Sequence, residues 1–196
     1  MAKVIREQVE DLGKQFQFYP KIATLVTAHA KGRDNAMAVA WHTPVAASPP
    51  LYGITVAPKR FTYQLIKESK EFGINFLPFE VAELVAAVGG CSGNEVDKFQ
   101  KFNIAKDRPV KTAVPILKAA YAAYECQLVD DRDYGDHRFL VGKIVAVHWL
   151  QDVFTPEEQL DMNKVNPILY IGRDVYLTTS KDTVRVLDRE LYSKGI

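Results

Sequence analysis

The chain has 196 residues and a formal net charge of +1 at pH 7, with 25 Lys and Arg residues against 24 Asp and Glu residues. These totals point to neither a nucleic acid nor an anionic membrane as a partner. The composition is globular, with 47% hydrophobic residues, and no apolar run approaches the roughly 20 residues that span a bilayer. The N-terminus lacks the apolar stretch of a signal peptide and the chain has two cysteines, so we expect a cytoplasmic protein.

The first half of the chain alternates short strand-like runs with short amphipathic runs. Residues 1–18 have a mixed pattern that predicts a short strand or helix. Strands are expected over residues 22–29, 35–45, 51–56 and 72–77. Helices are expected over residues 61–69, 80–88 and 95–102. The first two strands flank a four-residue turn at 31–34, which predicts a hairpin.

A second predicted hairpin dominates the rest of the chain. Residues 119–129 and 137–149 predict two long strands, and the acidic stretch 130–136 predicts the turn between them. Two shorter strands are expected at 168–171 and 174–178.

The complete pattern favours an antiparallel barrel with helical insertions over a parallel α/β sheet, because hairpins outnumber strand–helix–strand units. We expect one mainly β domain over residues 1–196, in which residues 150–196 form a C-terminal extension related to dimer formation.

A cationic corner follows the strand expected at 51–56. Lys59 and Arg60 come just after this apolar run, Thr62 follows, and a helix begins behind them. The free amides of a helix start, the point charge of a lysine and the donor fork of an arginine all favour a phosphate. The alternative is that both cations are ordinary solvated surface charges.

Small residues alternate along the strand expected at 35–45. Ala36, Ala38 and Ala40 leave one face without bulk, so a flat ligand could reach the backbone, whose N–H and C=O groups would read the edge of a heteroaromatic ring. The alternative is a closely packed barrel strand in which alanines fill a taper.

A glycine-rich loop runs from Gly89 to Phe99. Backbone amides in such loops bind anions or polar ring edges, although neither a P-loop nor a Rossmann pattern is present. The alternative is a simple connection between helices. Cys91 within this loop is either a redox thiol or a small packed side chain. The four histidines lack the spacing of a zinc site, and no metal is expected.

These segments, in this order, resemble the flavin reductase-like family over about residues 19–150. The most specific parts are Ser48-Pro-Pro50, the corner from Thr55 to Thr62, and Ser92-Gly-x-x-x-Asp97-Lys98-Phe99; Gly135-Asp-His137 also resembles the family's late hairpin. The resemblance implies an FMN-binding split β-barrel of the antiparallel Greek-key type. It also implies a homodimer with the flavin near the subunit interface.

The resemblance also implies a set of site residues. Residues 35–38 would meet the flavin through the backbone and the Asn35 side chain. His137 would lie on the nicotinamide or acceptor side and is the candidate catalytic residue. The residues expected to contact the flavin are Asn35, Ala36, Met37, Ala38, Trp41, His42, Val56, Lys59, Arg60, Thr62, Asn75, Cys91, Ser92, Gly93 and Lys98.

The implied activity is electron transfer from NAD(P)H through FMN, with FAD as the less favoured flavin, to free flavin, ferric iron or another acceptor. An alternative is a flavoredoxin-like carrier or flavin-binding module that a partner protein reduces. A third interpretation is a barrel that binds a different phosphorylated ligand.

Overall fold

Seven antiparallel strands form the main sheet of the structure, a computed structural model that describes residues 1–196 except 1–4, 6–8, 11–12, 14–16 and 194–196. The element predicted over residues 1–18 therefore lies largely outside the described residues. The strands of the main sheet are β2 (Thr24–Ala30), β3 (Arg33–Val39), β4 (His42–Ala46), β5 (Leu51–Val56), β6 (Glu71–Phe76), β9 (Ala122–Tyr134) and β10 (His137–Trp149). They pair in the order β3-β2-β6-β9-β10-β5-β4.

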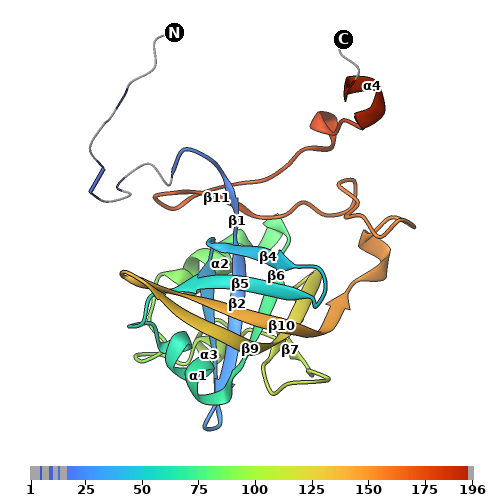
Figure 1. The fold of residues 1–196 in the computed structure, drawn as a ribbon. Helices are drawn as coiled ribbons and strands as arrows, with labels where there is room; N and C mark the ends of the chain where they lie inside the picture. The colour runs from blue at the N-terminus through green and yellow to red at the C-terminus, as the bar shows by residue number, and fades with distance from the viewer. Residues whose placement is uncertain (1–4, 6–8, 11–12, 14–16, 194–196) are drawn as a thin grey trace.

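The sheet closes because its two edge strands belong to one bent stretch of chain (Figure 1). Only Ala40 and Trp41 separate β3 from β4. The amide of Thr55 on β5 donates to the carbonyl of Trp41 at 2.8 Å and holds this bend. The single strand predicted over 35–45 is therefore wrong, since the bend makes it two strands at opposite edges. The predicted antiparallel, mainly β barrel is confirmed.

Both predicted hairpins form, with shorter turns than expected. The first turn is Lys31-Gly32, whose φ angles of 52° and 73° suit the right-handed twist of the two strands. In the second hairpin, residues 130–134 belong to β9 rather than to an acidic turn. Their three carboxylates all have cationic partners within the hairpin, because Arg132 pairs with Asp130, and Arg138 pairs with Asp131 and Asp133.

The helices lie close to the predicted positions. α1 (Phe61–Ser69) follows β5, and α2 (Ala82–Gly89) follows the 3-10 turn η2 (Phe79–Val81). α3 (Lys98–Lys101) is shorter than the helix predicted over 95–102, because the Asp97 side chain accepts a hydrogen bond from the Gln100 amide and starts the helix there. Within the described part of the chain, no helix is long and apolar enough to cross a membrane.

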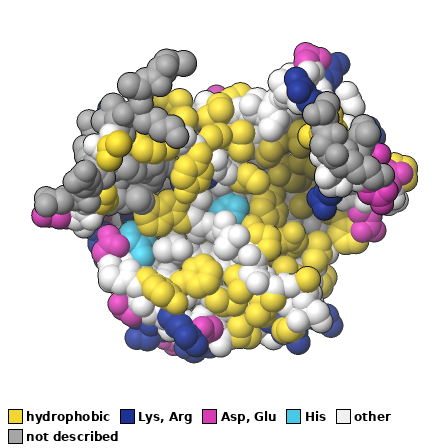
Figure 2. Space-filling model, turned by 45° about the horizontal axis from the view of Figure 1, so that its top comes forward, with side chains coloured by type: hydrophobic (Ala, Val, Ile, Leu, Met, Phe, Trp, Pro, Cys, Tyr) yellow, Lys and Arg dark blue, Asp and Glu magenta, His cyan; other side chains and the backbone are white. Residues whose placement is uncertain are grey.

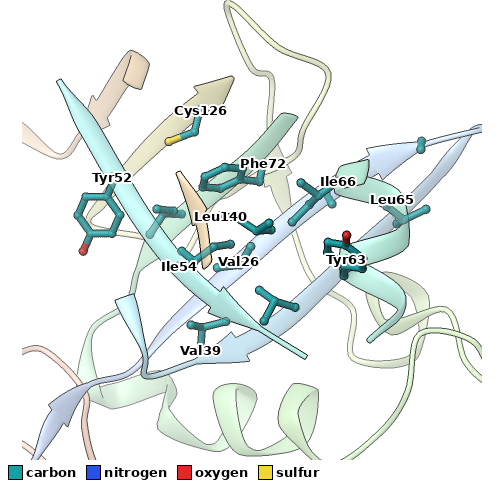
Figure 3. Close-up of a cluster of buried hydrophobic side chains, with 14 residues drawn as sticks. Val26, Val39, Tyr52, Ile54, Tyr63, Leu65, Ile66, Phe72, Cys126 and Leu140 are labelled. Atoms are coloured by element: carbon teal, nitrogen blue, oxygen red, sulfur yellow. The ribbon is translucent and has the colours of Figure 1, made fainter. Parts of the chain in front are cut away.

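An apolar cluster fills the barrel (Figure 3). Val26, Ile54, Phe72 and Leu140 come from four different strands and have no exposed surface. Ile66 of α1 joins them, also without exposed surface. Burial of each large apolar side chain contributes roughly 1.5–3 kcal/mol. The same contacts fix α1 against the barrel, and with it the residues that begin this helix.

A second apolar cluster joins α2 to β3. Val85 and Val88 of α2 have no exposed surface and belong to one cluster with Ala36. The small side chains of β3 let the helix approach, since a Cβ added at Gly89 would lie 3.3 Å from the Cβ of Ala38.

The C-terminal region returns to the barrel. β11 (Leu169–Gly172) pairs with β1 (Lys21–Ile22) and with β12 (Val175–Leu177) in a separate three-stranded sheet. The amide of Ala23 donates to the carbonyl of Ile168 at 2.9 Å, and Ile168 is fully buried. The remaining elements are β7 (Lys106–Asp107), β8 (Ile116–Leu117), η3 (Gln151–Val153), η4 (Lys181–Thr183) and α4 (Arg189–Ser193).

Candidate functional site

A cavity of about 240 Å³ lies where β3, the start of α1 and the loop after α2 meet. Three cationic side chains, Lys59, Arg60 and Lys98, line it. Among the described residues that line this cavity there is no Asp or Glu. Cations gathered in one cavity without a counter-charge favour an anionic ligand. We call this cavity the anion cavity.

Lys98 is the deepest of the three cations, with 3% of its surface exposed. Its Nζ donates to the carbonyl of Val88 at 2.7 Å, which uses one of the three ammonium donors. Burial lowers the pKa of Lys98, the nearby Cys91 raises it, and Arg60 lowers it further. A buried ammonium is costly unless an anion pairs with it, and no ion pair of Lys98 occurs among the described residues. The lysine is therefore placed to bind the anionic part of a ligand.

The N-terminus of α1 adds backbone donors to the anion cavity. Arg60 caps this nine-residue helix without a side-chain hydrogen bond, and its first turn carries no acidic residue. Phe61 and Thr62, the first two residues of the helix, line the cavity. The first amides of a helix lack partners within the helix and lie at its positive end, so they favour an anion.

Asn35 of β3 supplies a buried acceptor. Its side chain donates through Nδ2 to Thr62 Oγ1 at 2.8 Å, and only 1% of the residue is exposed. Its Oδ1 accepts no hydrogen bond from any residue that the structure describes. Because a buried acceptor without a donor costs free energy, a ligand hydroxyl at this position would satisfy it.

A second cavity of about 190 Å³ adjoins the first. Met37, Ala38 and Arg60 line both, so the two cavities form one groove along β3, which we call the β3 groove. β3 is an edge strand that pairs only with β2 through the sheet, so part of its backbone N–H and C=O groups remains available on the other edge. These groups match the donors and acceptors on the edge of a flat heteroaromatic ring.

Trp41 and His137 stand side by side in the second cavity of the β3 groove. Both line the second cavity, and their ring centroids lie 5.0 Å apart. His137 Nδ1 pairs with the carboxylate of Asp136 at 2.7 Å. The hydrogen bond from His137, together with its charge, lowers the pKa of Asp136. The imidazole is thus oriented in the second cavity, and Lys59 of the anion cavity is close enough to contribute to the lowered pKa of Asp136.

Most residues predicted for the site lie on this groove. They come from β3, the corner after β5, the loop after α2 and the β9–β10 hairpin, which the fold brings together. Those that line one or both cavities are Asn35, Met37, Ala38, Trp41, Val56, Lys59, Arg60, Thr62, Cys91, Ser92, Gly93, Lys98 and His137.

Three predicted residues do not line the β3 groove. Ala36 is fully buried under α2, so the packing alternative holds for its side chain. His42 forms hydrogen bonds through its two ring nitrogens, with Tyr52 Oη at 2.7 Å and with the Ile22 carbonyl at 2.9 Å. These bonds hold its side chain outside the two cavities of the groove. Asn75 is also fully buried.

The position of Asn75 has a clear physical reason. Its Nδ2 donates to the carbonyl of Leu25 at 3.0 Å, and its Oδ1 accepts from the amide of Leu117 at 2.8 Å. The side chain is therefore used to join three backbone segments inside the structure. The expectation that Asn75 lies near a flavin ring is corrected to this structural role.

Sequence reasoning missed several lining residues. Thr55 and Phe61 line the groove and stand inside segments that the family resemblance already covers. Tyr170, Asp174 and Tyr176 line a further cavity of about 230 Å³ that shares Ala38, Val39 and Ala40 with the groove. No sequence signal pointed to these three residues, because only the return of the C-terminal region brings them to β3.

Comparisons with known proteins identify the family of the chain. Residues 16–178 match a family described as the flavin reductase like domain. An uncharacterized protein of Aeropyrum pernix is 31% identical over 156 residues, which are 79% of this chain and 59% of that protein, so the chain spans less than two thirds of its length. A ferric-chelate reductase (NAD(P)H) of Archaeoglobus fulgidus is 26% identical over 65% of this chain and 75% of that protein.

Solved structures match over nearly the whole chain. An FMN-binding protein of Thermus thermophilus is 32% identical with a TM-score of 0.85, covering 94% of this chain and 100% of that one. Flavoredoxin from Methanosarcina acetivorans is 28% identical with a TM-score of 0.80, covering 96% and 97%. A protein of Shewanella frigidimarina with a split barrel domain has the same fold, at 21% identity and a TM-score of 0.78, covering 86% of each chain.

The family model covers most of the chain, and it includes β11 and β12, which lie beyond the region of the sequence resemblance. The split β-barrel expected from that resemblance is confirmed by the closed antiparallel sheet and by the structural neighbours. This chain therefore belongs to the flavin reductase-like family.

Proposed function

We propose that the protein binds FMN and passes electrons from NAD(P)H through it to free flavin, ferric iron or another acceptor. The observation that carries the proposal is an anion cavity with three cations and no acidic lining residue among those described, joined by Met37 and Ala38 to a second cavity beside an edge strand. FMN has a phosphate at one end and a flat polar-edged ring at the other. When bound, it supplies the redox chemistry, and the protein supplies placement and electrostatics.

The residues of the β3 groove divide between the two ends of such a ligand. Lys59, Arg60 and Lys98 would hold the phosphate together with the first amides of α1. Oδ1 of Asn35 would accept a hydrogen bond from a ribityl hydroxyl. The free edge of β3 would bind the polar edge of the ring.

Trp41 and His137 would stand at the ring end, where an electron donor or acceptor has to approach. Trp41 keeps 38% of its surface exposed, so this end of the groove borders solvent. The Asp136 carboxylate pairs with His137 Nδ1 at 2.7 Å and would fix the orientation of the imidazole there. Hydride transfer itself requires no further acid or base from the protein.

Named relatives support an enzymatic role. A protein similar to this chain is a ferric-chelate reductase that uses NAD(P)H, and a closely similar structure is an FMN-binding protein. The first experiment is the visible spectrum of the purified protein, followed by NADH and NADPH oxidation with added flavin or ferric chelate. Bound flavin together with turnover supports the proposal. Bound FMN with no turnover by either nucleotide would reject direct reduction by NAD(P)H.

A second candidate is an electron carrier that a partner protein reduces. The exposed indole of Trp41 at the ring end and the similarity to a flavoredoxin favour this candidate. Stopped-flow reduction distinguishes the two candidates. A carrier reacts slowly with NADH and NADPH but rapidly with a reduced redox protein, whereas a reductase reacts rapidly with at least one nucleotide.

We also propose that the protein is a homodimer. Figure 2 shows a hollowed face on which hydrophobic side chains gather around a histidine. A depression of about 580 Å³ adjoins the ring end and is lined by Ile22, Trp41, Pro44 and Phe139 together with other residues. Extended apolar surfaces are uncommon on monomers and commonly mark association sites. A second copy of the chain is the occupant that we propose for this face.

A further inference from the structure

The side chains of Arg33, Asn35 and Met37 follow one another along the same side of β3, because alternate residues of a strand share a face. Met37 belongs to both cavities of the β3 groove, and Asn35 lines the anion cavity. Arg33 is one step further along the strand and does not line either cavity. It therefore stands just beyond the end of the groove that carries the cations.

Arg33 ties this end of the groove together. Its Nη2 donates to the carbonyl of Gly93 at 2.6 Å, and its guanidinium carbon lies 4.6 Å from the centre of the Phe61 ring. One side chain thus connects the start of β3 with the loop after α2 and with the first residue of α1. All three segments line the anion cavity.

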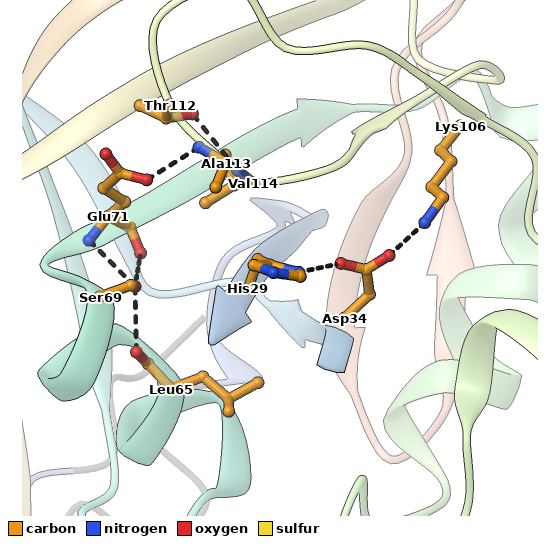
Figure 4. Close-up of polar contacts among 9 residues, drawn as sticks. All are labelled: His29, Asp34, Leu65, Ser69, Glu71, Lys106, Thr112, Ala113 and Val114. Atoms are coloured by element: carbon orange, nitrogen blue, oxygen red, sulfur yellow. Dashed lines mark hydrogen bonds and ion pairs between the residues drawn. The ribbon is translucent and has the colours of Figure 1, made fainter. Parts of the chain in front are cut away.

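The neighbouring residue keeps the start of β3 in place. Asp34 pairs with His29 of β2 at 2.6 Å and also with Lys106 of β7 (Figure 4). Because Asp34 pairs with both His29 and Lys106, the backbone of β3 next to Arg33 is held in place. The bond to Gly93 then limits the movement of the loop rather than that of the strand.

Gly93 is pressed against the other two segments. A Cβ added to Gly93 would come within 2.7 Å of Phe61 Cδ1 and into direct conflict with Oδ1 of Asn35. The loop therefore packs directly against Asn35 and Phe61 on the side of Gly93, and Gly93 itself is buried. A ligand that extends past Asn35 would have to displace the loop and break the bond to Arg33.

We propose that Arg33 is a specificity-determining residue that closes the phosphate end of the groove and selects FMN over FAD. FMN ends in a terminal monophosphate, whereas FAD continues through a second phosphate to an adenosine. The closed end of the groove accepts the terminal monophosphate of FMN and obstructs the second phosphate and adenosine of FAD. This inference rests on the proposed flavin site and deepens it by naming the class of flavin that the site accepts.

The test is calorimetric titration of the flavin-free protein with riboflavin, FMN and FAD. The variant is Arg33→Met, which keeps an unbranched stem and removes the guanidinium. The matched control is Arg132→Met, because Arg132 is an exposed arginine that pairs with Asp130 at 2.8 Å away from the groove. We expect wild type and the control to bind FMN at least about tenfold more tightly than FAD. In Arg33→Met we expect this ratio to fall by about tenfold, while riboflavin affinity changes by less than about threefold.

Gly93→Ala tests the same closure by a different route. The added methyl group pushes the loop away from Asn35 and Phe61 without touching Arg33. A smaller preference for FMN over FAD in this variant supports the proposal. If wild type binds both flavins equally, or if Arg33→Met weakens both by the same factor, the role of Arg33 is rejected. Failure of the wild type to bind all three flavins would instead reject the proposed flavin site.

Discussion

Substitution of Lys59 and Arg60 tests whether the protein binds the phosphate of the flavin independently of its ring. We expect Lys59→Ala combined with Arg60→Ala to weaken FMN binding by roughly 100-fold or more, because each removes a charge-assisted hydrogen bond of about 1.5–3 kcal/mol. Riboflavin lacks the phosphate and should lose little affinity. Fluorescence titration with both ligands measures the difference.

The control for this pair is Lys67→Ala, which removes an exposed cation from the last turn of the same helix. It should leave both affinities unchanged. Equal losses for FMN and riboflavin in the double variant would show that the corner does not hold the phosphate.

Glu125 is a fully buried carboxylate outside the groove. Its oxygens accept hydrogen bonds from the amides of Val110, Lys111 and Thr112 at 2.7 to 2.9 Å, and from His148 Nε2 at 2.7 Å. Burial raises the pKa of Glu125, but these hydrogen bonds outweigh burial and bring the pKa down to about 2. The carboxylate therefore stays ionised and fixes the loop around residues 110–112.

The lowered pKa of Glu125 predicts how stability depends on pH. Its ordinary value is 4.5, so the stabilisation is fully present above about pH 4.5 and is lost as the pH falls toward 2. We expect Glu125→Gln to lower the free energy of unfolding by about 2–3 kcal/mol at pH 7, because an amide cannot accept all these hydrogen bonds. Urea unfolding at several pH values should show the difference from wild type shrinking below pH 4.5.

Glu157→Gln is the control for this series, because Glu157 is an exposed carboxylate on a turn. Its unfolding free energy should follow that of wild type at every pH. A difference between Glu125→Gln and wild type that stays constant from pH 7 to pH 2 would contradict an ionised Glu125 in the folded state.

β3 and α2 together determine the width of the groove. Ala38 is small enough for α2 to approach, and it borders the two cavities of the groove as well as the cavity lined by the C-terminal tyrosines. We expect Ala38→Leu to weaken flavin binding by at least about tenfold, because the added carbons occupy the space of the ligand. Far-UV circular dichroism should stay unchanged, since the residue is only partly buried.

The matched variant is Ala113→Leu, which enlarges an exposed alanine remote from the groove. It should retain the affinity of wild type for FMN. Unchanged binding in Ala38→Leu would mean that the ligand does not pass along β3.

The elements that were predicted best have strong local signals. α1 matches its predicted range because an apolar stripe and a polar face lie within nine consecutive residues. The break at Ala40 and Trp41 was not predicted, because both residues continue an extended apolar pattern. Closure of the barrel imposes that break, since the segments on its two sides have to pair at opposite edges of the sheet.

At the scale of the whole molecule, the proposed homodimer makes a prediction about Val45. Val45 is 43% exposed on β4. Its Cγ2 and the Phe139 ring lie on the same side of Gly53. We expect Val45→Asp to convert a dimer into a monomer, because it places an unpaired charge close to Phe139, which lines the apolar depression. Light scattering after size exclusion should give a mass near twice 22.1 kDa for wild type and near 22.1 kDa for the variant.

Val129→Asp provides the comparison, because Val129 is an exposed strand valine with 55% of its surface accessible. It should remain dimeric. A wild-type mass near 22.1 kDa at micromolar concentration would reject the dimer and leave the apolar face without a second copy.

Local patterns in the sequence determined the hairpins and the helix after the cationic corner, and they singled out Lys59, Arg60 and the small residues of β3, whereas most other groove residues were named only through the family resemblance. These features depend on contiguous patterns, such as the alternation in β10 or the two cations that follow β5. The resemblance to a family then assigned chemistry to segments that local patterns left open between binding and packing.

Only the tertiary structure decided which of the predicted polar residues face the groove. Asn35 and Asn75 are both buried asparagines on neighbouring parts of the sheet, yet Asn35 retains a free acceptor within the described structure and Asn75 uses its oxygen on Leu117. Likewise, Tyr170 and Tyr176 reach the neighbourhood of β3 only because β11 pairs with β1. The reason is physical: a side chain's partners are set by long-range strand pairing, which brings together residues far apart in the chain and leaves no local trace in their sequence.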